Sequence, residues 1–133
     1  QTMQDTPEYN NVGLEVLDFF IAQIDKLRSR FIPDIILDPG FGFGKTVAHN
    51  YELLNTIHAF RFLQCPVLTG ISRKSMIYKP LDIAPEDALN GTTALHMKAL
   101  IEGSKILRVH DVKAAMETIR LFELLESNQP KSN

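Results

Sequence analysis

The chain has 133 residues, of which 44% are hydrophobic and 23% are charged, and its formal net charge is −2. This length is enough for one domain with a real core, and the nearly neutral charge provides no basic surface that would attract nucleic acid or an anionic membrane. The single cysteine excludes an internal disulfide, and because the sequence has neither an apolar run of about 18 residues nor a signal-peptide pattern, we expect a cytoplasmic protein without a membrane-spanning helix.

The first half of the chain alternates between helical and strand-like patterns. In chain order, the sequence predicts a polar loop over residues 1–11, a helix from residue 14 that ends before Pro33, a strand over residues 35–37, a glycine-rich loop over residues 40–45 and a helix over residues 50–63. The first helix is expected to bury a stripe of apolar residues at helical spacing, namely Leu14, Leu17, Ile21, Ile24 and Leu27. The second is expected to turn four apolar residues inward, Leu53, Leu54, Ile57 and Phe60.

The second half continues the alternation. The sequence predicts a strand over residues 66–70, a basic loop over residues 72–75 that opens a short helical turn, a helix over residues 85–102 that Gly103 stops, a strand over residues 105–109, a helix over residues 112–126 that Asp111 caps, and a polar tail. The last helix is expected to turn inward three apolar residues, Met116, Ile119 and Phe122. Strands that alternate with helices of this length form a parallel sheet with right-handed crossovers.

The spacing between strands fits two architectures. Equivalent positions on successive strands, Ile35, Val67 and Ile106, are 32 and 39 residues apart. A (β/α)8 barrel of about 250 residues averages about 31 residues per unit, so the spacing suits units of a barrel as well as an open doubly wound sheet. Three strands cannot close a barrel, and a three-stranded sheet is small even for an open fold.

Polar residues and glycines gather just after the carboxyl end of each predicted strand. In parallel α/β folds, ligands bind at this edge. Asp38 follows the first strand, and its carboxylate is interpreted either as an acceptor for the N–H groups of a heterocyclic ligand or as a turn aspartate that caps the loop backbone. The residues alone favour neither interpretation.

In the glycine-rich loop over residues 40–45, Phe41 and Phe43 alternate with Gly40, Gly42 and Gly44. Its end, Gly44-Lys45-Thr46, resembles a phosphate-binding P-loop, but Pro39 stands where the first glycine of that motif is required. We therefore reject a nucleotide fingerprint and consider a mobile loop that carries an aromatic ring to a flat ligand. For Phe41 the simpler interpretation, a side chain in the core, is preferred.

Cationic residues follow the second and third strands. Ser72, Arg73 and Lys74 suit an anion, although a solvated basic loop is the alternative. Arg108 and His110 are two residues apart, so on a strand both would point to one face and could bind one oxyanion. The alternative is an ion pair between Arg108 and a carboxylate such as Asp111, with His110 as a packing residue. The remaining histidines, His49, His58 and His96, show no three-ligand metal spacing.

Four segments together resemble one family. They are DPGFGFGK at residues 38–45, TGISRKSM at residues 69–76, NGTT at residues 90–93 and LRVHDV at residues 107–112, and they resemble dihydropteroate synthases in order and spacing. The resemblance implies a (β/α)8 barrel that joins p-aminobenzoate to 6-hydroxymethyl-7,8-dihydropterin diphosphate and releases pyrophosphate, a step of folate synthesis with which sulfonamides compete.

The resemblance also implies roles for individual residues. Asp38, Gly70 and Lys74 would contact the pterin, with Lys74 lying partly over its ring, while Phe43 and Ser72 would border the p-aminobenzoate site. Arg108 and His110 would hold the diphosphate, so that Lys74, Arg108 and His110 carry catalysis by stabilising the leaving group.

The resemblance covers only the end of that family's barrel. It implies that residues 1–126 are its C-terminal half, with the last three βα units and the preceding helix, and that residues 127–133 are a polar tail. The first-strand asparagine that helps to bind Mg²⁺ in the family would be missing, so we expect this fragment alone to hold no metal and to be inactive. The start at Gln1, without an initiator Met, agrees with a fragment. A homodimer is expected from the family's last helices.

Two alternatives remain for the function. The first is a non-catalytic pterin-binding or oligomerisation module that is complete as it stands. The second is a domain similar to methyltetrahydrofolate methyltransferases, against which Arg108 and His110 argue, because methyl transfer has no diphosphate to bind. In every case the expected partners are small molecules, not nucleic acid or membranes.

Overall fold

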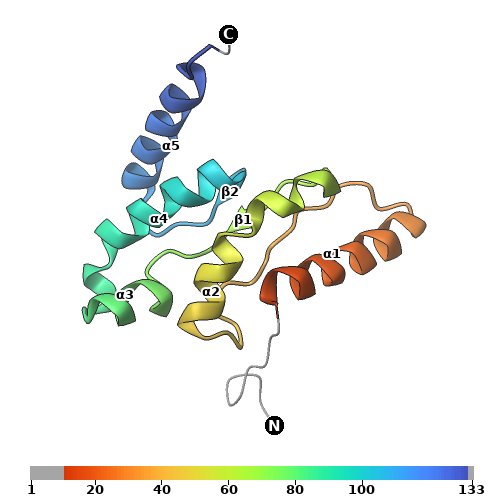
Figure 1. The fold of residues 1–133 in the computed structure, drawn as a ribbon, viewed down its shortest axis with the longest axis horizontal. Coiled ribbons are helices and arrows are strands. Elements are labelled where there is room, and N and C mark those ends of the chain that lie inside the picture. Colours follow the sequence, from red (N-terminus) through yellow and green to blue (C-terminus); the bar gives the residue numbers. More distant parts are fainter. Residues whose placement is uncertain (1–10, 132–133) are drawn as a thin grey trace.

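The computed structural model describes residues 11–131, which form an α/β arrangement (Figure 1). In chain order the elements are α1 (Val12–Ser29), α2 (Val47–Leu54), the 3-10 helix η1 (Ile57–Leu63), β1 (Leu68–Thr69), α3 (Ser75–Leu81), the 3-10 helix η2 (Pro85–Asp87), α4 (Leu89–Glu102), β2 (Ile106–Leu107) and α5 (Val112–Ser127). The loop predicted for residues 1–11 lies, except for Asn11, outside the described residues. None of the helices within residues 11–131 is both long and apolar enough to cross a membrane.

The three predicted strands lie parallel and in chain order, but they are shorter than predicted. Leu68 of β1 pairs with Ile106 of β2, and Thr69 of β1 pairs with Leu107 of β2. The segment predicted over residues 35–37 makes a single parallel bridge, from Leu37 to Val67. Within residues 11–131 this segment has a neighbour on one side only, which leaves too few ladder hydrogen bonds for a regular strand.

Helix α1 begins at Val12, two residues earlier than predicted, and its buried face is different from the predicted one. The side chain of Asn11 accepts a hydrogen bond from the backbone N–H of Leu14 and caps the helix. Leu14 is 55% exposed and Ile21 is 44% exposed, so the predicted stripe is wrong at these two positions. The helix is turned so that Phe20 packs edge-on against Phe60, with 5.2 Å between ring centroids, because an aromatic ring buries more apolar area than a leucine.

The helix predicted over residues 50–63 is two helices, α2 and η1. Helix α2 begins at Val47, three residues earlier than predicted, because the Thr46 side chain accepts from the backbone N–H of His49 while the His49 ring accepts from that of Thr46. The break falls at Asn55 and Thr56. There the Thr56 hydroxyl donates to the carbonyl oxygen of Glu52, a bond that competes with helical geometry.

Between β1 and β2, the helix predicted over residues 85–102 is confirmed over residues 89–102, where it is α4, and its predicted first turn is the separate 3-10 helix η2. The chain forms α3 directly after the basic loop, then η2, and only then α4, which begins at Leu89. The helical turn expected at the basic loop is confirmed and continues for seven residues, with Pro80 inside its last turn. Gly103 ends α4 as predicted, whereas the Asp111 side chain does not cap α5.

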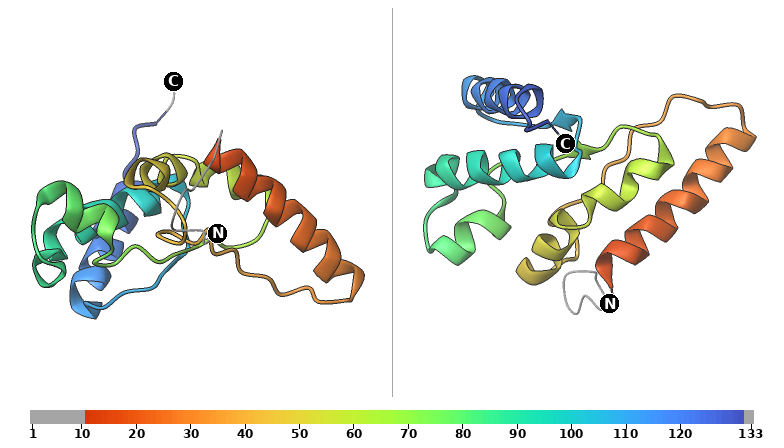
Figure 2. Two further views of the ribbon diagram at one scale, coloured as in Figure 1. Left: turned by 90° about the horizontal axis from the view of Figure 1, so that it is seen from below. Right: turned by 45° about the horizontal axis from the view of Figure 1, so that its top comes forward.

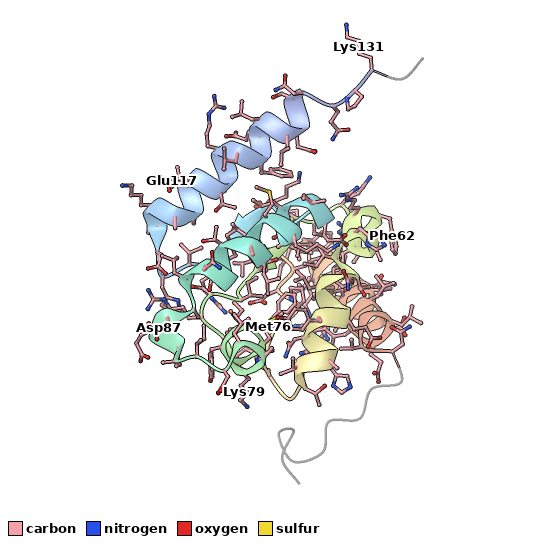
Figure 3. All side chains as sticks on the ribbon, turned by 60° about the vertical axis from the view of Figure 1, so that its left-hand side comes forward. Phe62, Met76, Lys79, Asp87, Glu117 and Lys131 are labelled. Carbon is pink, nitrogen blue, oxygen red and sulfur yellow. The ribbon has the colours of Figure 1, made fainter. Side chains whose placement is uncertain are left out.

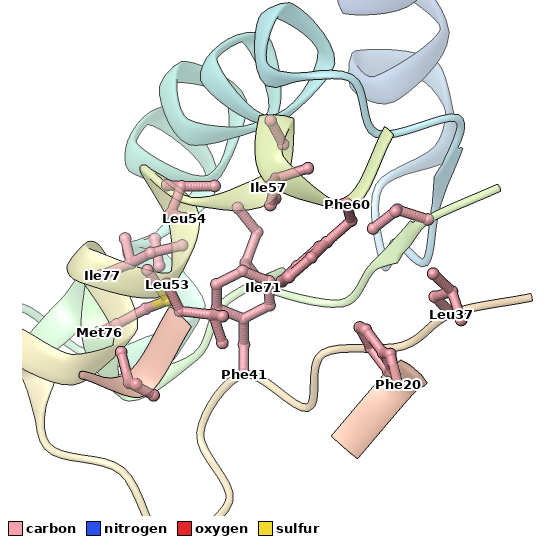
Figure 4. Packing of buried hydrophobic residues seen from close by; sticks show 14 of the residues in the cluster. Phe20, Leu37, Phe41, Leu53, Leu54, Ile57, Phe60, Ile71, Met76 and Ile77 are labelled. Atoms are coloured by element: carbon pink, nitrogen blue, oxygen red, sulfur yellow. The ribbon is translucent and has the colours of Figure 1, made fainter. Parts of the chain in front are cut away.

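The core lies between the glycine-rich loop and the helices that follow it (Figure 4). Phe41, Leu53, Phe60 and Ile71 are all buried in one cluster, which confirms the inward face predicted for α2 and η1. The core therefore anchors the Phe41 side of the glycine-rich loop. This rigid base positions the loops at the carboxyl edge of the sheet.

Helices α1 and α5 lie at opposite ends of the molecule (Figures 1 and 2). Helix α5 lies over α4 (Figure 3) and buries only two small residues, Ala115 and Thr118. Met116, predicted to face inward, is 60% exposed. Small side chains allow α4 and α5 to approach closely, and this contact determines the rotation of α5 more strongly than the bulk of its apolar residues does.

Candidate functional site

The candidate site is built from the three loops that follow the parallel segments. Contacts across these loops join residues far apart in the chain. Arg108 reaches Asp38, with 3.8 Å between Nη1 and Oδ2, and Lys74 reaches the Phe41 carbonyl oxygen, with 2.7 Å between Nζ and O. The strand ends therefore converge as the alternation of strands and helices predicts.

Asp38 combines the two interpretations that the sequence left open. Its Oδ1 accepts a hydrogen bond from the backbone N–H of Gly40 (3.0 Å), as a turn aspartate does. Its Oδ2 points toward Arg108, and the Asp38 side chain remains 44% exposed. One carboxylate oxygen thus holds the loop while the other faces the open edge of the sheet.

Arg108 lies directly over Gly70. A Cβ atom on Gly70 would stand 2.5 Å from Nη2 of Arg108, so the guanidinium would have to move away. Glycine at position 70 therefore gives the guanidinium its path toward Asp38. The sequence left open an ion pair between Arg108 and a carboxylate such as Asp111. The carboxylate that Arg108 pairs with is Asp38, and Asp111 binds Arg73 instead.

Lys74 is held in place between loops. Besides its bond to Phe41, its ammonium lies 5.4 Å from the centroid of the Phe43 ring, within range of a cation–π contact. Burial lowers the pKa of Lys74, the positive charges of Arg108 and Lys45 lower it further, and Asp38 opposes the change. Three cations thus surround one carboxylate, so the edge attracts anions.

Lys45 is a site residue that the sequence reasoning missed. It donates hydrogen bonds to the carbonyl oxygens of Gly40 (2.7 Å) and Phe43 (3.2 Å) and so closes the glycine-rich loop on itself. Burial lowers the pKa of Lys45, and Asp38 opposes that change. The position of Lys45 at the end of the glycine-rich loop could have indicated its role. Lys45 was considered only as part of a P-loop motif, and it was left out when that motif was rejected.

Ser72 and His110 form a pair across two loops. The Ser72 hydroxyl lies 2.8 Å from Nδ1 of the His110 ring, and it also accepts from the backbone N–H of His110 at 3.3 Å. Ser72 is buried and is not among the residues that line the cavity beside Phe43. His110 is exposed, and Nε2 of its ring has no hydrogen-bond partner among residues 11–131.

Arg73 is bound internally. Its guanidinium makes two hydrogen bonds to the Asp111 carboxylate, of 2.7 and 3.1 Å, and its backbone N–H donates to the Thr92 hydroxyl. The backbone φ of Arg73 is 55°, an uncommon conformation for a residue with a side chain. Arg73 therefore fastens the loop after β1 to the loop after β2, and Lys74 is the cation of that loop that faces the edge.

A cavity of about 440 Å³ opens beside these loops. Its lining combines three aromatic side chains, a proline, two cations and a serine: Phe41, Gly42, Phe43, Arg73, Lys74, Ser75, Tyr78 and Pro85. Ser75 and Tyr78 were missed by the sequence reasoning, because no pattern placed the first two turns of α3 against the glycine-rich loop. The lining suits a small aromatic molecule that carries an anionic group.

A metal centre is not formed by the described residues. Within residues 11–131, no group of three or more His, Cys, Asp and Glu side chains could hold a metal ion. Asp38, the carboxylate at the edge, lies among Lys45, Lys74 and Arg108. This positive surrounding does not fit Mg²⁺.

The fold and the site define an α/β protein with an anion-attracting ligand site at the carboxyl edge of parallel strands. The chain belongs to the family of pterin binding enzymes, which it matches over residues 1–110.

Individual relatives support the family assignment. The dihydropteroate synthase of Escherichia coli is 43% identical over 125 residues, which cover 92% of this chain and 44% of the relative. A crystal structure of Yersinia pestis dihydropteroate synthase with a sulfonamide drug superposes with a TM-score of 0.90 at 37% identity, over 94% of this chain and 46% of that one. The Thermus thermophilus enzyme in complex with 4-aminobenzoate gives 0.87 at 38% identity, over 93% and 51%. The chain thus spans about half the length of the relatives it matches.

Proposed function

We propose that the natural polypeptide carrying this chain is a dihydropteroate synthase. The observation that carries the proposal is the convergence of Asp38, Lys74 and Arg108 at one edge of the sheet, beside an aromatic-lined cavity. In the proposed reaction, the amino nitrogen of p-aminobenzoate attacks the methylene carbon of 6-hydroxymethyl-7,8-dihydropterin diphosphate. The carbon–oxygen bond to the diphosphate breaks, pyrophosphate leaves, and the amine loses a proton.

The proposed roles in pterin and diphosphate binding come from the family resemblance, and the contacts at the edge of the sheet support them. Asp38 accepts hydrogen bonds from the N–H edge of the pterin, Gly70 leaves room for that ring beside Arg108, and Lys74 lies against the ring face. Arg108 and His110 bind the diphosphate and stabilise the charge that develops on it as it leaves. Lys74 adds positive charge to the same edge.

The proposed p-aminobenzoate site is the cavity beside Phe43. Phe43 is 63% exposed and forms one wall, while Lys74 supplies positive charge near the carboxylate of the substrate. The serine that lines this cavity is Ser75. We assign to Ser72 a different role from the one the sequence suggested: it donates to Nδ1 of His110, so that the proton of the neutral ring is on Nε2 and faces the diphosphate.

The proposed architecture is part of a (β/α)8 barrel. Residues 1–126 would be its C-terminal half, with the segment at Leu37, β1 and β2 as its last three strands, α1 as the helix that precedes them, and residues 127–133 as a tail. The observations in support are the parallel order of the three segments and the single-sided pairing of Leu37 within residues 11–131. The Mg²⁺ implied by the resemblance is assigned to none of residues 11–131.

The exposed apolar faces support further contacts in the natural protein. On α5, the large exposed apolar residues are Val112, Met116, Leu121, Leu124 and Leu125. Exposed apolar patches mark interaction surfaces. We propose that a second copy covers this face in a homodimer, while further barrel units cover Ile36 and the outer face of α1. Analytical ultracentrifugation of the natural protein tests for the dimer.

The experiment that tests the activity is an assay of the purified natural polypeptide with both substrates. We expect pyrophosphate and dihydropteroate in equal amounts, and only when p-aminobenzoate and the pterin diphosphate are both present. A sulfonamide should raise the KM for p-aminobenzoate without changing kcat. Pterin binding without pyrophosphate release would indicate a non-catalytic module, and methyl transfer from methyltetrahydrofolate would indicate the other enzyme class. Either result contradicts the proposal.

A further inference from the structure

Asn50 is a buried polar residue on α2 that contacts the glycine-rich loop. Its side chain is 2% exposed. Its Oδ1 accepts a hydrogen bond from the backbone N–H of Gly42 (2.8 Å), and its Nδ2 donates to the carbonyl oxygen of Thr46 (2.9 Å). Because both ends of the amide are bonded, the side chain has one orientation. The helix that carries it is anchored in the core by Leu53 and Leu54.

The N–H that Asn50 binds belongs to the peptide group that joins Phe41 to Gly42. The carbonyl oxygen of this same peptide group accepts the hydrogen bond from Nζ of Lys74 (2.7 Å). A peptide group is planar, so its N–H and C=O point in opposite directions and turn together. Asn50 on one side and Lys74 on the other therefore bind the same planar peptide group.

The backbone next to this peptide group is flexible, so the hydrogen bond to Asn50 is needed to fix its orientation. Gly42 has a φ of 95°, a region open mainly to glycine, whose backbone is also the most flexible. Phe41 is fixed by its buried ring, but Phe43 on the other side of Gly42 is largely exposed. The hydrogen bond from Gly42 to Asn50 ties this flexible position to a helix, and a helix holds site geometry better than a loop does.

We propose that Asn50 is a positioning residue that fixes the Phe41–Gly42 peptide group and, through its carbonyl, the ammonium of Lys74. Asn50 touches neither substrate in this proposal. It determines where the Lys74 charge and the Phe43 ring stand at the cavity, and so how well p-aminobenzoate is held. The proposal rests on the proposed synthase activity.

The test replaces Asn50 in the natural protein and separates KM from kcat. In Asn50→Leu, of similar size, the peptide group loses its partner and Lys74 shifts. We expect the KM for p-aminobenzoate to rise about tenfold and kcat/KM to fall about 10- to 100-fold, the size of effect that a misplacement of about 1 Å produces. Loss of folded protein alone would lower the apparent kcat and leave both KM values unchanged.

Two further variants complete the test. Asn50→Asp keeps an oxygen that can accept from Gly42, so it should return the KM for p-aminobenzoate to within about threefold of wild type. Asn55→Ala, at an exposed position after α2, is the matched control and should not change either KM.

The outcomes separate this inference from the function on which it rests. An inactive wild-type protein contradicts the synthase proposal. An active wild type with an unchanged p-aminobenzoate KM in Asn50→Leu, whatever happens to its kcat, overturns the role of Asn50. A failure of Asn50→Asp to restore the KM overturns it as well, because the contact to Gly42 would then not be the one that matters.

Discussion

The hydroxyl of Ser72 lies 2.8 Å from Nδ1 of His110, and this contact joins the loop after β1 to the loop after β2. Ser72 is 6% exposed, whereas His110 is at the open edge. A buried hydroxyl thus orients an exposed imidazole, as the outer partners of ligating histidines do. Ser72 and Ser75, three residues apart, therefore have separate roles. Ser72 orients His110, and Ser75 lines the cavity beside Phe43.

Two serine variants test this division. In the natural protein, Ser72→Ala leaves Nδ1 without its partner, so we expect the KM for the pterin diphosphate to rise several-fold and the KM for p-aminobenzoate to stay the same. Ser75→Ala should have the reverse effect, because Ser75 lines the cavity beside Phe43. Steady-state kinetics with each substrate varied in turn measures both constants. Equal effects of the two variants on both constants would contradict the separation.

Arg108 should contribute strongly to diphosphate binding. Hydrogen bonds to charged groups contribute about 1.5–3 kcal/mol, so Arg108→Ala should weaken the binding of the pterin diphosphate about 10- to 150-fold. Isothermal titration calorimetry of the natural protein measures the affinity. Arg61→Ala is the matched control, since Arg61 donates to the carbonyl oxygen of Ile101 at the opposite end of the sheet. An unchanged affinity in Arg108→Ala would exclude the proposed contact.

Gly70→Ala should weaken diphosphate binding by displacing the guanidinium of Arg108. The new Cβ would lie 2.5 Å from Nη2 of Arg108, and the guanidinium is the far end of a flexible side chain, so it can move away. We expect the melting temperature to change by only a few degrees while the affinity for the pterin diphosphate falls nearly as far as in Arg108→Ala. In the double variant, the two losses should not add, because both remove the same contact. Additive losses in calorimetry would show that Gly70 acts independently of Arg108.

Helical periodicity was enough to predict α1 and α5 but not their rotation. The spacing of Leu14 on α1 and Met116 on α5 predicts that both face inward, but both are exposed. Phe20 packs into the core in place of Leu14, and the small residues of α5 pack in place of Met116. Helix α3 was missed beyond its first turn, since a seven-residue helix that contains Pro80 has too few positions to show a period.

The strand-end rule located Asp38, Lys74, Arg108 and His110, because parallel strands bring their carboxyl ends together whatever the loops do. It did not show how loop residues pair. Arg73 with Asp111 and Ser72 with His110 are each 38 residues apart in the chain. Such contacts depend on loop backbone geometry, including the left-handed φ of Arg73, which no local pattern encodes.

His96 should make the stability of the protein depend on pH. Its side chain is 2% exposed, and its Nε2 has no hydrogen-bond partner within the described residues. Burial lowers the pKa of His96 below the ordinary value of 6.5. The unfolded chain therefore binds this proton at a higher pH than the folded protein does, so the contribution to stability is complete above pH 6.5 and is lost as the pH falls toward the folded pKa.

The measurement is urea unfolding of the natural protein at about pH 7.5 and about pH 5.5, on either side of the ordinary histidine pKa. We expect wild type to lose stability at the lower pH, and His96→Leu to lose less, because leucine takes up no proton. His58→Gln is the control, since His58 is exposed and bonds Glu102 at the surface. Its pH dependence should differ from that of His96→Leu. If the stability of wild type and that of His96→Leu depend on pH in the same way, the buried imidazole of His96 is not the cause of the pH dependence.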